Sequence, residues 1–381
     1  MADYKIFSAD SHVSEPADLW TSRMDKKWQF RAPRIESRER DGKLQDFFIY
    51  EGFPPHGVGV GLGAAQREGP GTSRFREEGK GMSDALPGGW DPVARLDEQD
   101  SDGVEGEILH TTLGFRLFWL EDPGLQRECF RAYNDWLAEY CSHAPNRLIG
   151  VPLISMHDIP LAIEELHRTA KLGLRGAMIW LSPPANMPPY NSSFYDPFWA
   201  ACQEMDTPIV LHEITGGGYE SKLSASAYWR EDWSLSALIR AHEVQRTLGV
   251  LILSGVFERF PRLKIISAEN GTDWIPYYVG RLNRLRGNNS YGSNLSLRPI
   301  EYFHRNVSFT YINEQHIVEN REVVGVNNLM FATDYPHSAS TFPKSQEVVE
   351  RDTGHIPEEE KRKLIHDNVL RIFNIPAPVL V

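Results

Sequence analysis

Short apolar segments recur along the chain, and stretches with helical periodicity separate them. Most of these segments are continuous apolar runs rather than alternating ones, which is typical of parallel strands covered on both faces. The pattern predicts eight strands, at residues 4–10, 103–110, 148–154, 175–181, 208–213, 264–269, 306–311 and 329–334. Amphipathic stretches between them predict helices, which include residues 125–142, 158–172, 196–205, 232–248 and 272–285.

Eight strands that are each followed by helical sequence favour an α/β fold of the (β/α)₈ barrel type, formed by one domain over residues 1–381. A doubly wound open sheet predicts the same local pattern, so the number of strands does not separate these two folds.

A long segment from about residue 20 to residue 100 interrupts this alternation. It is rich in Gly, Arg and Glu, its periodicity is weak, and it follows the first predicted strand. Connections this long are uncommon unless they form a lid or a subunit contact. We expect it to emerge on the C-terminal face, where barrel active sites lie. Its GVGVGLG run, residues 57–63, follows a Pro-Pro pair rather than a strand, so we interpret it as a flexible loop and not a nucleotide-binding turn.

Net charge, apolar stretches and cysteine spacing exclude several classes of partner and location. The net charge is −12 and no run is polybasic, which argues against nucleic acid or an anionic membrane. No apolar stretch approaches the length of a transmembrane helix. The first residues lack the features of a signal peptide, and three cysteines without CxxC spacing do not indicate a disulfide framework. We therefore expect a cytoplasmic protein that acts on a small molecule.

Polar residues close four of the predicted strands. Asp10 and His12 end the first strand and, lying two positions apart, point to the same face. His212, Glu269 and Asp334 stand at or next to the ends of three later runs that are otherwise apolar. Barrel strands carry catalytic side chains at their C-terminal ends, so these residues predict one shared site.

This set of imidazoles and carboxylates suits one divalent metal ion. Zn²⁺ is the expected ion, and Mn²⁺ and Fe²⁺ are alternatives on ligand type. Such an ion acidifies bound water and polarises a carbonyl group. A neighbouring carboxylate can then accept the proton from water, and we assign that task to Asp334.

Several further residues are weaker candidates. His337 follows Asp334 in the sequence DYPH and could orient Asp334 or contact substrate, while His242 lies within a predicted helix as a second catalytic candidate. The remaining candidates are a strand-end histidine, four aromatic residues for a pocket wall and two arginines for a substrate carboxylate: His110, Trp119, Trp180, Tyr190, Trp229, Arg74 and Arg76.

Five segments together resemble the amidohydrolase superfamily, in the branch that contains aminocarboxymuconate-semialdehyde decarboxylase. They are SADSHVSEPADLW (8–20), PIVLHE (208–213), SGVFERFPRLKIISAENGTDWIPYYVGRL (254–282), FATDYPHSAST (331–341) and HDNVLRIFNI (366–375). The resemblance implies a distorted (β/α)₈ barrel with one catalytic metal at its C-terminal mouth. By matching position, it implies Asp10, His12, His212 and Asp334 as ligands, with Asp334 also moving the proton.

The sixth strand departs from the decarboxylases of this branch, which tend to have a His-Gly pair there. Here the sequence is Ala268-Glu269-Asn270-Gly271, and a glutamate binds metal readily but does not donate a proton at neutral pH unless its pKa is raised. Relatives with this glutamate include hydrolases that cleave carbon–carbon bonds. We therefore expect a metal-dependent hydrolase of a C–C, amide or ester bond, with a non-oxidative decarboxylase as the alternative. A homodimer is expected, because a lid that packs on a second subunit would explain an ordered long segment.

Overall fold

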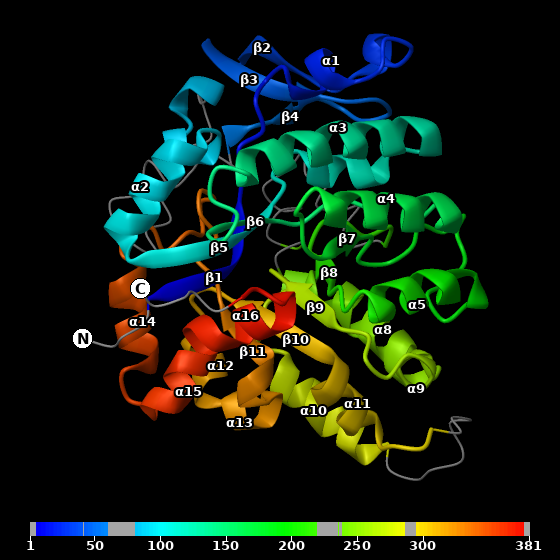
Figure 1. Cartoon of the computed structure of the whole chain (residues 1–381), viewed down its shortest axis with the longest axis vertical. Coiled ribbons are helices and arrows are strands. Elements are labelled where there is room, and N and C mark those ends of the chain that lie inside the picture. The colour runs from blue at the N-terminus through cyan, green and yellow to red at the C-terminus, as the bar shows by residue number, and fades with distance from the viewer. Residues whose placement is uncertain are drawn as a thin grey trace.

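The computed structural model describes residues 5–40, 42–59, 81–218, 235, 238–285 and 295–376. Within these residues, eight parallel strands form the centre of the molecule (Figure 1). They follow one another in chain order as two sheets, β1-β5-β6 and β7-β8-β9-β10-β11. The strands are β1 (Ile6–His12), β5 (Val104–His110), β6 (Leu148–Gly150), β7 (Ala177–Ile179), β8 (Ile209–His212), β9 (Ile265–Ala268), β10 (Val307–Tyr311) and β11 (Leu329–Phe331).

Backbone contacts join the two sheets at both seams. A parallel bridge between Leu153 and Met178 connects the segment after β6 to β7. At the other seam, the Asp334 N–H donates to the Asp10 carbonyl at 2.9 Å, which ties the end of β11 to β1. The sheets therefore close on each other, and the predicted distorted (β/α)₈ barrel is confirmed.

Helices surround the strands (Figure 1). Several begin where the sequence offers an Asp-Pro or similar cap: Asp122 accepts from the N–H groups of Gly124 and Leu125 at the start of α3, and Pro123 occupies the first helical position. The helices are α1 (Leu19–Arg23), α2 (Pro92–Asp102), α3 (Pro123–Cys141), α4 (Ile159–Lys171), α5 (Asp196–Glu204), α8 (Ala241–Leu253), α9 (Val256–Arg259), α10 (Ile275–Arg284), α11 (Pro299–Asn306), α12 (Gln315–Glu319), α13 (Arg321–Val324), α14 (Ser345–Thr353), α15 (Glu358–Arg362) and α16 (Asn368–Phe373).

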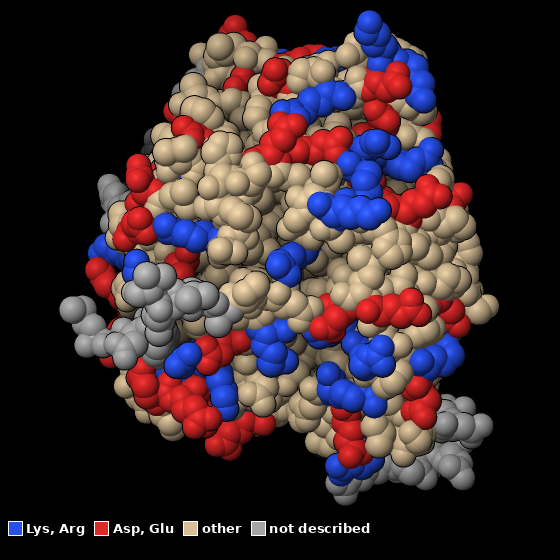
Figure 2. Space-filling model, in the orientation of Figure 1, with Lys and Arg blue, Asp and Glu red and all other residues tan. Residues whose placement is uncertain are grey.

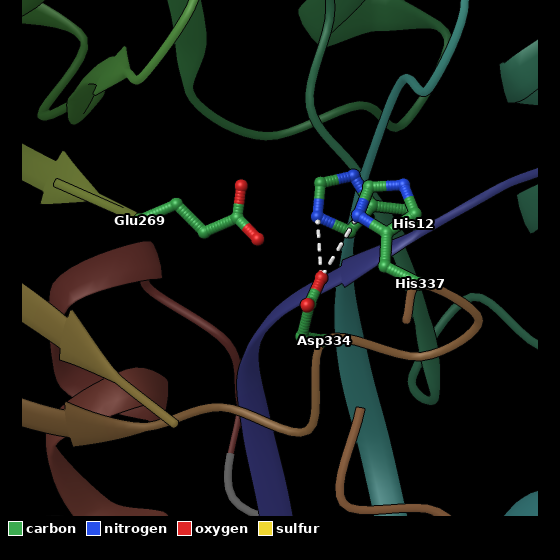
Figure 3. A group of neighbouring side chains, drawn as sticks. All are labelled: His12, Glu269, Asp334 and His337. Atoms are coloured by element: carbon green, nitrogen blue, oxygen red, sulfur yellow. Dashed lines mark ion pairs between the residues drawn. The ribbon is translucent and has the colours of Figure 1, made fainter. Parts of the chain in front are cut away.

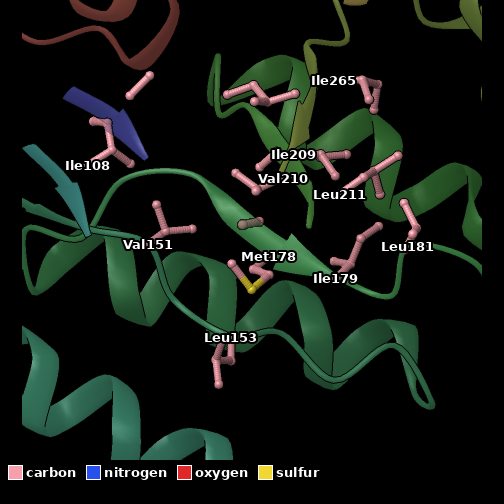
Figure 4. Close-up of a cluster of buried hydrophobic side chains, with 14 of the residues drawn as sticks. Ile108, Val151, Leu153, Met178, Ile179, Leu181, Ile209, Val210, Leu211 and Ile265 are labelled. Atoms are coloured by element: carbon pink, nitrogen blue, oxygen red, sulfur yellow. The ribbon is translucent and has the colours of Figure 1, made fainter. Parts of the chain in front are cut away.

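Aliphatic side chains of the short strands fill the interior between strands and helices (Figure 4). Ile108, Met178, Val210 and Ile265 come from four different strands and are at most 1% exposed. Burying a side chain of this size contributes about 1.5–3 kcal/mol, so these runs fix the strands that carry the polar residues at their ends.

One predicted helix has different bounds in the structure. The pattern predicts a helix over residues 232–248, whereas α8 begins at Ala241 and continues to Leu253. Residues 232–234 and 236–237 lie outside the described residues. The apolar run GVLIL extends the buried face beyond residue 248, and the helix ends where Gly255 takes a left-handed conformation with φ 78°.

The 20–100 segment contains regular structure that the sequence pattern does not predict. Strands β2 (Arg34–Arg40), β3 (Lys43–Ile49) and β4 (His56–Gly57) form an antiparallel sheet, seen at the top of Figure 1 near α1 and α3. Charged residues on its exposed face hide the alternation, while Phe48 is fully buried against Trp20 with ring centroids 5.2 Å apart. The expected GVGVGLG loop therefore begins as β4, and its residues from Val60 onward lie outside the described part of the chain.

The C-terminal part of this segment is helical. Residues 92–102 form α2, which begins at the cap Asp91, ends at Gly103 with φ 71° and leads directly into β5. This helix is part of the barrel, so the insertion ends before it. The described insertion contacts the loop after β5: His56 Nε2 lies 2.8 Å from Arg116 Nη2, and the rings of Phe53 and Trp119 are 5.8 Å apart. These contacts place it at the C-terminal side of β5, and its action as a lid stays a prediction.

Acidic and basic side chains are intermingled on the face shown in Figure 2. Many form exposed ion pairs, such as Arg23 with Glu139 at 2.7 Å, which individually contribute about 0–1 kcal/mol. Among the described residues, no helix is both long and apolar enough to cross a membrane. The expected partners, the homodimer and the cytoplasmic location stay predictions.

Candidate metal centre

The structure brings the five predicted ligand residues together at the carboxyl ends of the strands. Asp10 and His12 lie at the end of β1, and His212 is the last residue of β8. Glu269 follows β9 directly, and Asp334 lies three residues after β11. Each lies at or just after the end of a buried apolar strand. This is why the pattern of polar residues at strand ends could predict all five.

Asp10 lies at the centre of the group. Its Oδ1 atom is 3.4 Å from His12 Nε2 and 3.5 Å from His212 Nε2. Its Oδ2 atom accepts a hydrogen bond from the Thr310 hydroxyl at 3.2 Å. One carboxylate oxygen is thus anchored to the barrel, and the other faces the Nε2 atoms of His12, His212 and His110.

Asp334 contacts the two imidazoles labelled in Figure 3. Its Oδ1 atom lies 3.3 Å from His12 Nε2 and 3.0 Å from His337 Nδ1. The ring of His337 stacks on that of His12, with centroids 3.8 Å apart and an interplanar angle of 22°. The structure therefore places His337, a weaker candidate in the sequence, in direct contact with this group.

Glu269 points from the end of β9 toward the same group (Figure 3), and its Oε2 atom lies 3.6 Å from His212 Nε2. Its backbone has φ 56°, and that of Asp334 has φ 52°. A left-handed conformation costs a non-glycine residue about 1–2 kcal/mol, and such strain is concentrated at functional sites. The positive φ values set the direction of both carboxylates, and the sequence alone does not predict these turns.

The ligand atoms that face one another lack hydrogen bonds although they are buried. They are Asp10 Oδ1, His12 Nε2, His212 Nε2, Asp334 Oδ1 and Asp334 Oδ2. The opposite ring nitrogens are satisfied, since Nδ1 of His12 contacts the Thr111 carbonyl at 2.9 Å and Nδ1 of His212 contacts the Glu213 carbonyl at 3.1 Å. A carbonyl only accepts, so each Nδ1 carries the hydrogen, and in the neutral imidazole each Nε2 is then left with a lone pair for a metal.

Three separations among these atoms match those expected around one ion. Ligand atoms held at about 2.1 Å in tetrahedral geometry are separated from one another by about 3.4 Å. The distances given above from Asp10 to His12, from Asp10 to His212 and from Asp334 to His12 range from 3.3 to 3.5 Å. The candidate ligands fall into two groups whose ligand atoms lie within 4.8 Å of one another, one of Asp10, His12 and His212 and one of His12, Glu269, Asp334 and His337, and His12 belongs to both. The donor set therefore fits a divalent metal next to His12.

Burial by itself raises the pKa of both central carboxyl groups. For Asp10 the imidazoles of His110 and His212 outweigh this effect, so its pKa falls well below the usual value. For Asp334 the same competition, with His337 as the largest opposing influence, also gives a lowered pKa. Both groups are therefore carboxylates at neutral pH, as metal ligands must be.

Burial and neighbouring charges also shift the pKa values of His12 and Glu269. Burial lowers the pKa of His12, but contacts with Asp10 and Asp334 raise it to about 10. Burial and then the nearby Asp334 raise the pKa of Glu269 well above its usual value. The centre thus favours positive charge and disfavours a further negative one, and a divalent cation would satisfy both tendencies.

Apart from the described aromatic residues, the remaining sequence candidates divide into three groups. His110 Nε2 lies 3.5 Å from Asp10 Oδ1, and burial lowers its pKa to about 3, so it is a neutral neighbour of the centre. His242 is exposed at the second position of α8 and is not brought together with the predicted ligands. Trp229, Arg74 and Arg76 lie outside the described residues.

The aromatic candidates are buried and hydrogen-bonded to the backbone. Trp180 Nε1 donates to the Phe118 carbonyl at 3.0 Å, Trp119 Nε1 donates to the Gly216 carbonyl at 3.0 Å, and the Tyr190 hydroxyl donates to the Trp180 carbonyl. The ring next to the centre is instead Phe115, 4.3 Å from the His212 ring. Sequence reasoning missed it because no strand end or motif marks it.

Thr112 is a second residue that the sequence did not single out. Its hydroxyl lies 2.9 Å from His337 Nε2, on the side of the ring opposite Asp334. Its only signal is position, two residues after the end of β5.

A sequence model of the amidohydrolase family matches residues 111–375. Gamma-resorcylate decarboxylase of Polaromonas sp. (strain JS666) is 25% identical over 300 residues, which cover 74% of this chain and 86% of the relative. The crystal structure of an amidohydrolase from Mycobacterium avium subsp. paratuberculosis K-10 superposes with a TM-score of 0.78 at 22% identity and covers 98% of this chain and all of that chain.

A further similar structure contains a metal. It is a dihydroxybenzoic acid decarboxylase from Polaromonas sp. JS666 with bound manganese and the inhibitor 2-nitroresorcinol. Its TM-score is 0.60 at 24% identity, and the match covers 74% of this chain and 85% of that chain. Together with the confirmed barrel, the family match over most of the chain settles the classification: this protein belongs to the amidohydrolase family.

Proposed function

We propose that this protein is a metal-dependent decarboxylase that removes CO₂ from an aromatic or dienoic carboxylic acid. The observation that carries the proposal is the group of buried carboxylate and imidazole atoms without hydrogen bonds at the strand ends. The choice of reaction is supported by the curated relative that bears the name of a decarboxylase. This reverses the preference drawn from the sequence, in which hydrolysis came first.

Asp10, His12, His212 and Asp334 would hold one divalent ion. When bound, the ion would supply a positive centre for the substrate carboxylate and an adjacent oxygen. Two carboxylates with two imidazoles suit Mn²⁺ as well as Zn²⁺, and the manganese in the similar decarboxylase favours testing Mn²⁺ first.

The chain's own residues would orient the substrate and supply a proton. The ring of Phe115, which lies against His212, offers a face on which a flat substrate can pack. Loss of CO₂ leaves an electron pair on the ring carbon, and that carbon must gain one proton. We assign this proton to Glu269, whose carboxyl group points at the centre and whose side chain is 13% exposed.

Hydrolysis is the second candidate, because a glutamate such as Glu269 can also bind a metal directly. In that reaction Glu269 would serve as an additional anionic ligand, and Asp334 would accept the proton of an attacking water. The two functions thus assign different tasks to one side chain.

Isotope tracing separates the reactions. Protein loaded with Mn²⁺ or Zn²⁺ is incubated with gamma-resorcylate and related aromatic acids, and products are analysed by mass spectrometry. In D₂O, decarboxylation releases CO₂ and leaves one deuterium on the carbon that lost the carboxylate. In H₂¹⁸O, hydrolysis places the label in a product instead. Label in a product without CO₂ release would overturn the decarboxylase proposal.

A Glu269→Gln variant tests the assigned task. If Glu269 donates the proton, the variant should lose turnover while its metal content stays near that of the wild type. If Glu269 is instead a metal ligand, as in the hydrolase, the variant should lose metal and turnover together.

A further inference from the structure

One turn contacts two imidazoles of the metal centre. It consists of residues 111–114, which lead from β5 into the short 3₁₀ helix Gly114–Trp119. The Thr111 carbonyl accepts from His12 Nδ1 at 2.9 Å, and the Thr112 hydroxyl lies 2.9 Å from His337 Nε2. Phe115, the next residue, lies against His212. The position of this turn therefore governs how two imidazoles are oriented.

A buried carboxylate, Glu15, holds the turn. It is fully buried, and it accepts hydrogen bonds from the backbone N–H groups of Thr112 at 3.0 Å, Leu113 at 3.0 Å and Gly114 at 3.1 Å. The Thr111 hydroxyl donates to the same group. Successive N–H groups that converge on one anion form a strong local site, so the carboxylate and the turn fix each other.

We propose that Glu15 is a positioning residue for the metal centre. Through the turn it holds His12 with the hydrogen on Nδ1 and the lone pair of Nε2 toward the metal. Through Thr112 it directs His337 Nδ1 at Asp334, which lies 3.0 Å away. The inference rests on the metal site proposed above, but it does not depend on which bond the enzyme breaks.

A second carboxylate offers a matched comparison. Glu314 follows β10 and accepts from the backbone N–H groups of Ile312 at 2.7 Å and Asn313 at 3.0 Å. It thus stabilises a turn after a barrel strand in the same way, but among the described residues this turn makes no hydrogen bond with an imidazole of the centre. A purely structural role would make the two glutamates equivalent.

The main experiment compares Glu15→Gln with Glu314→Gln in the full chain. In each variant an amide NH₂ group replaces an accepting oxygen, so the backbone donors lose a partner. Zn²⁺ affinity is measured by competition with a chelator, and the imidazole N–H resonances are recorded in Zn²⁺-loaded, ¹⁵N-histidine-labelled protein.

We expect Glu15→Gln to weaken Zn²⁺ binding about 10–100-fold and to shift or remove the His12 Nδ1–H resonance. Glu314→Gln should leave both unchanged. Equal Zn²⁺ affinity and unchanged resonances in Glu15→Gln would overturn the inference. Wild-type protein that binds no Zn²⁺ would instead overturn the proposed metal site, and the inference with it.

Thr112 provides an independent test if Glu15→Gln does not fold. Thr112→Val removes the hydroxyl beside His337 with little change in shape, and Thr112→Ser keeps it. We expect the valine variant to lower kcat about tenfold at unchanged KM and to shift the His337 resonance, and the serine variant to restore both. A valine variant with wild-type kcat and resonance would contradict the role of the turn.

Discussion

Two buried carboxylates near the end of β1 have opposite surroundings. Glu107, on β5, is 2% exposed and both of its oxygens are hydrogen-bonded. Its Oε2 atom accepts from Arg95 Nε at 2.5 Å and from Gln99 Nε2 at 2.6 Å, and its Oε1 atom accepts from the Ser11 hydroxyl at 2.9 Å. Its charge is balanced entirely by the protein.

Asp334 is fully buried, yet neither of its oxygens has a hydrogen bond. The partners of Asp334 are instead the imidazoles of His12 and His337, which lie 3.3 and 3.0 Å from its Oδ1 atom. The comparison shows how a buried charge can be interpreted: Glu107 has a permanent cation and hydrogen bonds from the protein, whereas Asp334 faces ionisable imidazoles, a setting that suits a metal cation.

The two regions are connected through β1. Arg95, which neutralises Glu107, also donates to the backbone carbonyl of His12 at 2.9 Å. Ser11, which donates to Glu107, lies between Asp10 and His12 in the sequence. We call Glu107 with Arg95, Gln99 and Ser11 the balanced cluster, and the metal-site residues around Asp334 the unbalanced cluster. The balanced cluster therefore holds the end of β1, which carries Asp10 and His12 of the unbalanced cluster.

The largest expected effect comes from removing the imidazoles of the unbalanced cluster. A His12→Ala, His212→Ala double variant should lose the metal and all measurable turnover, because both Nε2 donors are absent. Metal is counted by inductively coupled plasma mass spectrometry, with His167→Ala, an exposed histidine on α4, as the control. Full metal content in the double variant would show that the ion lies elsewhere.

Asp334→Asn should lower turnover at least about a hundredfold while much of the metal remains. The amide keeps one oxygen for the ion but lacks the negative charge that Asp334 presents to the ion and to His337. Turnover and metal content are measured on the same preparation. Turnover like that of the wild type would remove Asp334 from the mechanism.

Breaking the balanced cluster should mainly affect stability. Arg95→Met leaves Glu107 buried without its cation, which costs about 3–5 kcal/mol in the free energy of unfolding. Adding Glu107→Leu should recover most of that loss, since no charge then remains. Urea denaturation measures both, and a loss below about 1 kcal/mol in Arg95→Met would refute the structural role of this pair.

The smallest expected effect is the gain in the free energy of unfolding when the wild-type protein binds metal. An ion that binds only the folded protein, present at about a hundred times its Kd, adds about 2.7 kcal/mol to the free energy of unfolding. Chelation should reverse this gain, and the His12→Ala, His212→Ala variant should show none. Identical urea midpoints with and without Mn²⁺ in the wild type would contradict the assignment of a cation site.

The sequence predicted the strands, because they are short apolar runs that need no tertiary information to recognise. The barrel, rather than a doubly wound sheet, was implied by the resemblance to the amidohydrolase superfamily. Polar residues at strand ends then predicted Asp10, His12, His212, Glu269 and Asp334 as neighbours, because parallel strands share one carboxyl edge. Both predictions depend on a local pattern that recurs at each strand of this fold, an apolar run with a polar residue at or after its end.

Features set by tertiary contacts could not be predicted. The antiparallel sheet of the insertion carries exposed charged residues that hide its period of two. The positive φ of Asp334 and the contact of Thr112 with His337 depend on how distant turns pack. His242 resembled a functional histidine only by residue type, and the helix directs it outward.

The seam between β11 and β1 has a consequence for biosynthesis. Asp10 and Asp334 share a backbone hydrogen bond across the closing edge of the barrel, yet nearly the whole chain separates them in sequence. During translation, about 320 further residues must therefore be added after Asp10 before the two halves of the centre can meet. A nascent chain that stops short of Asp334 has no assembled site with which to capture an ion.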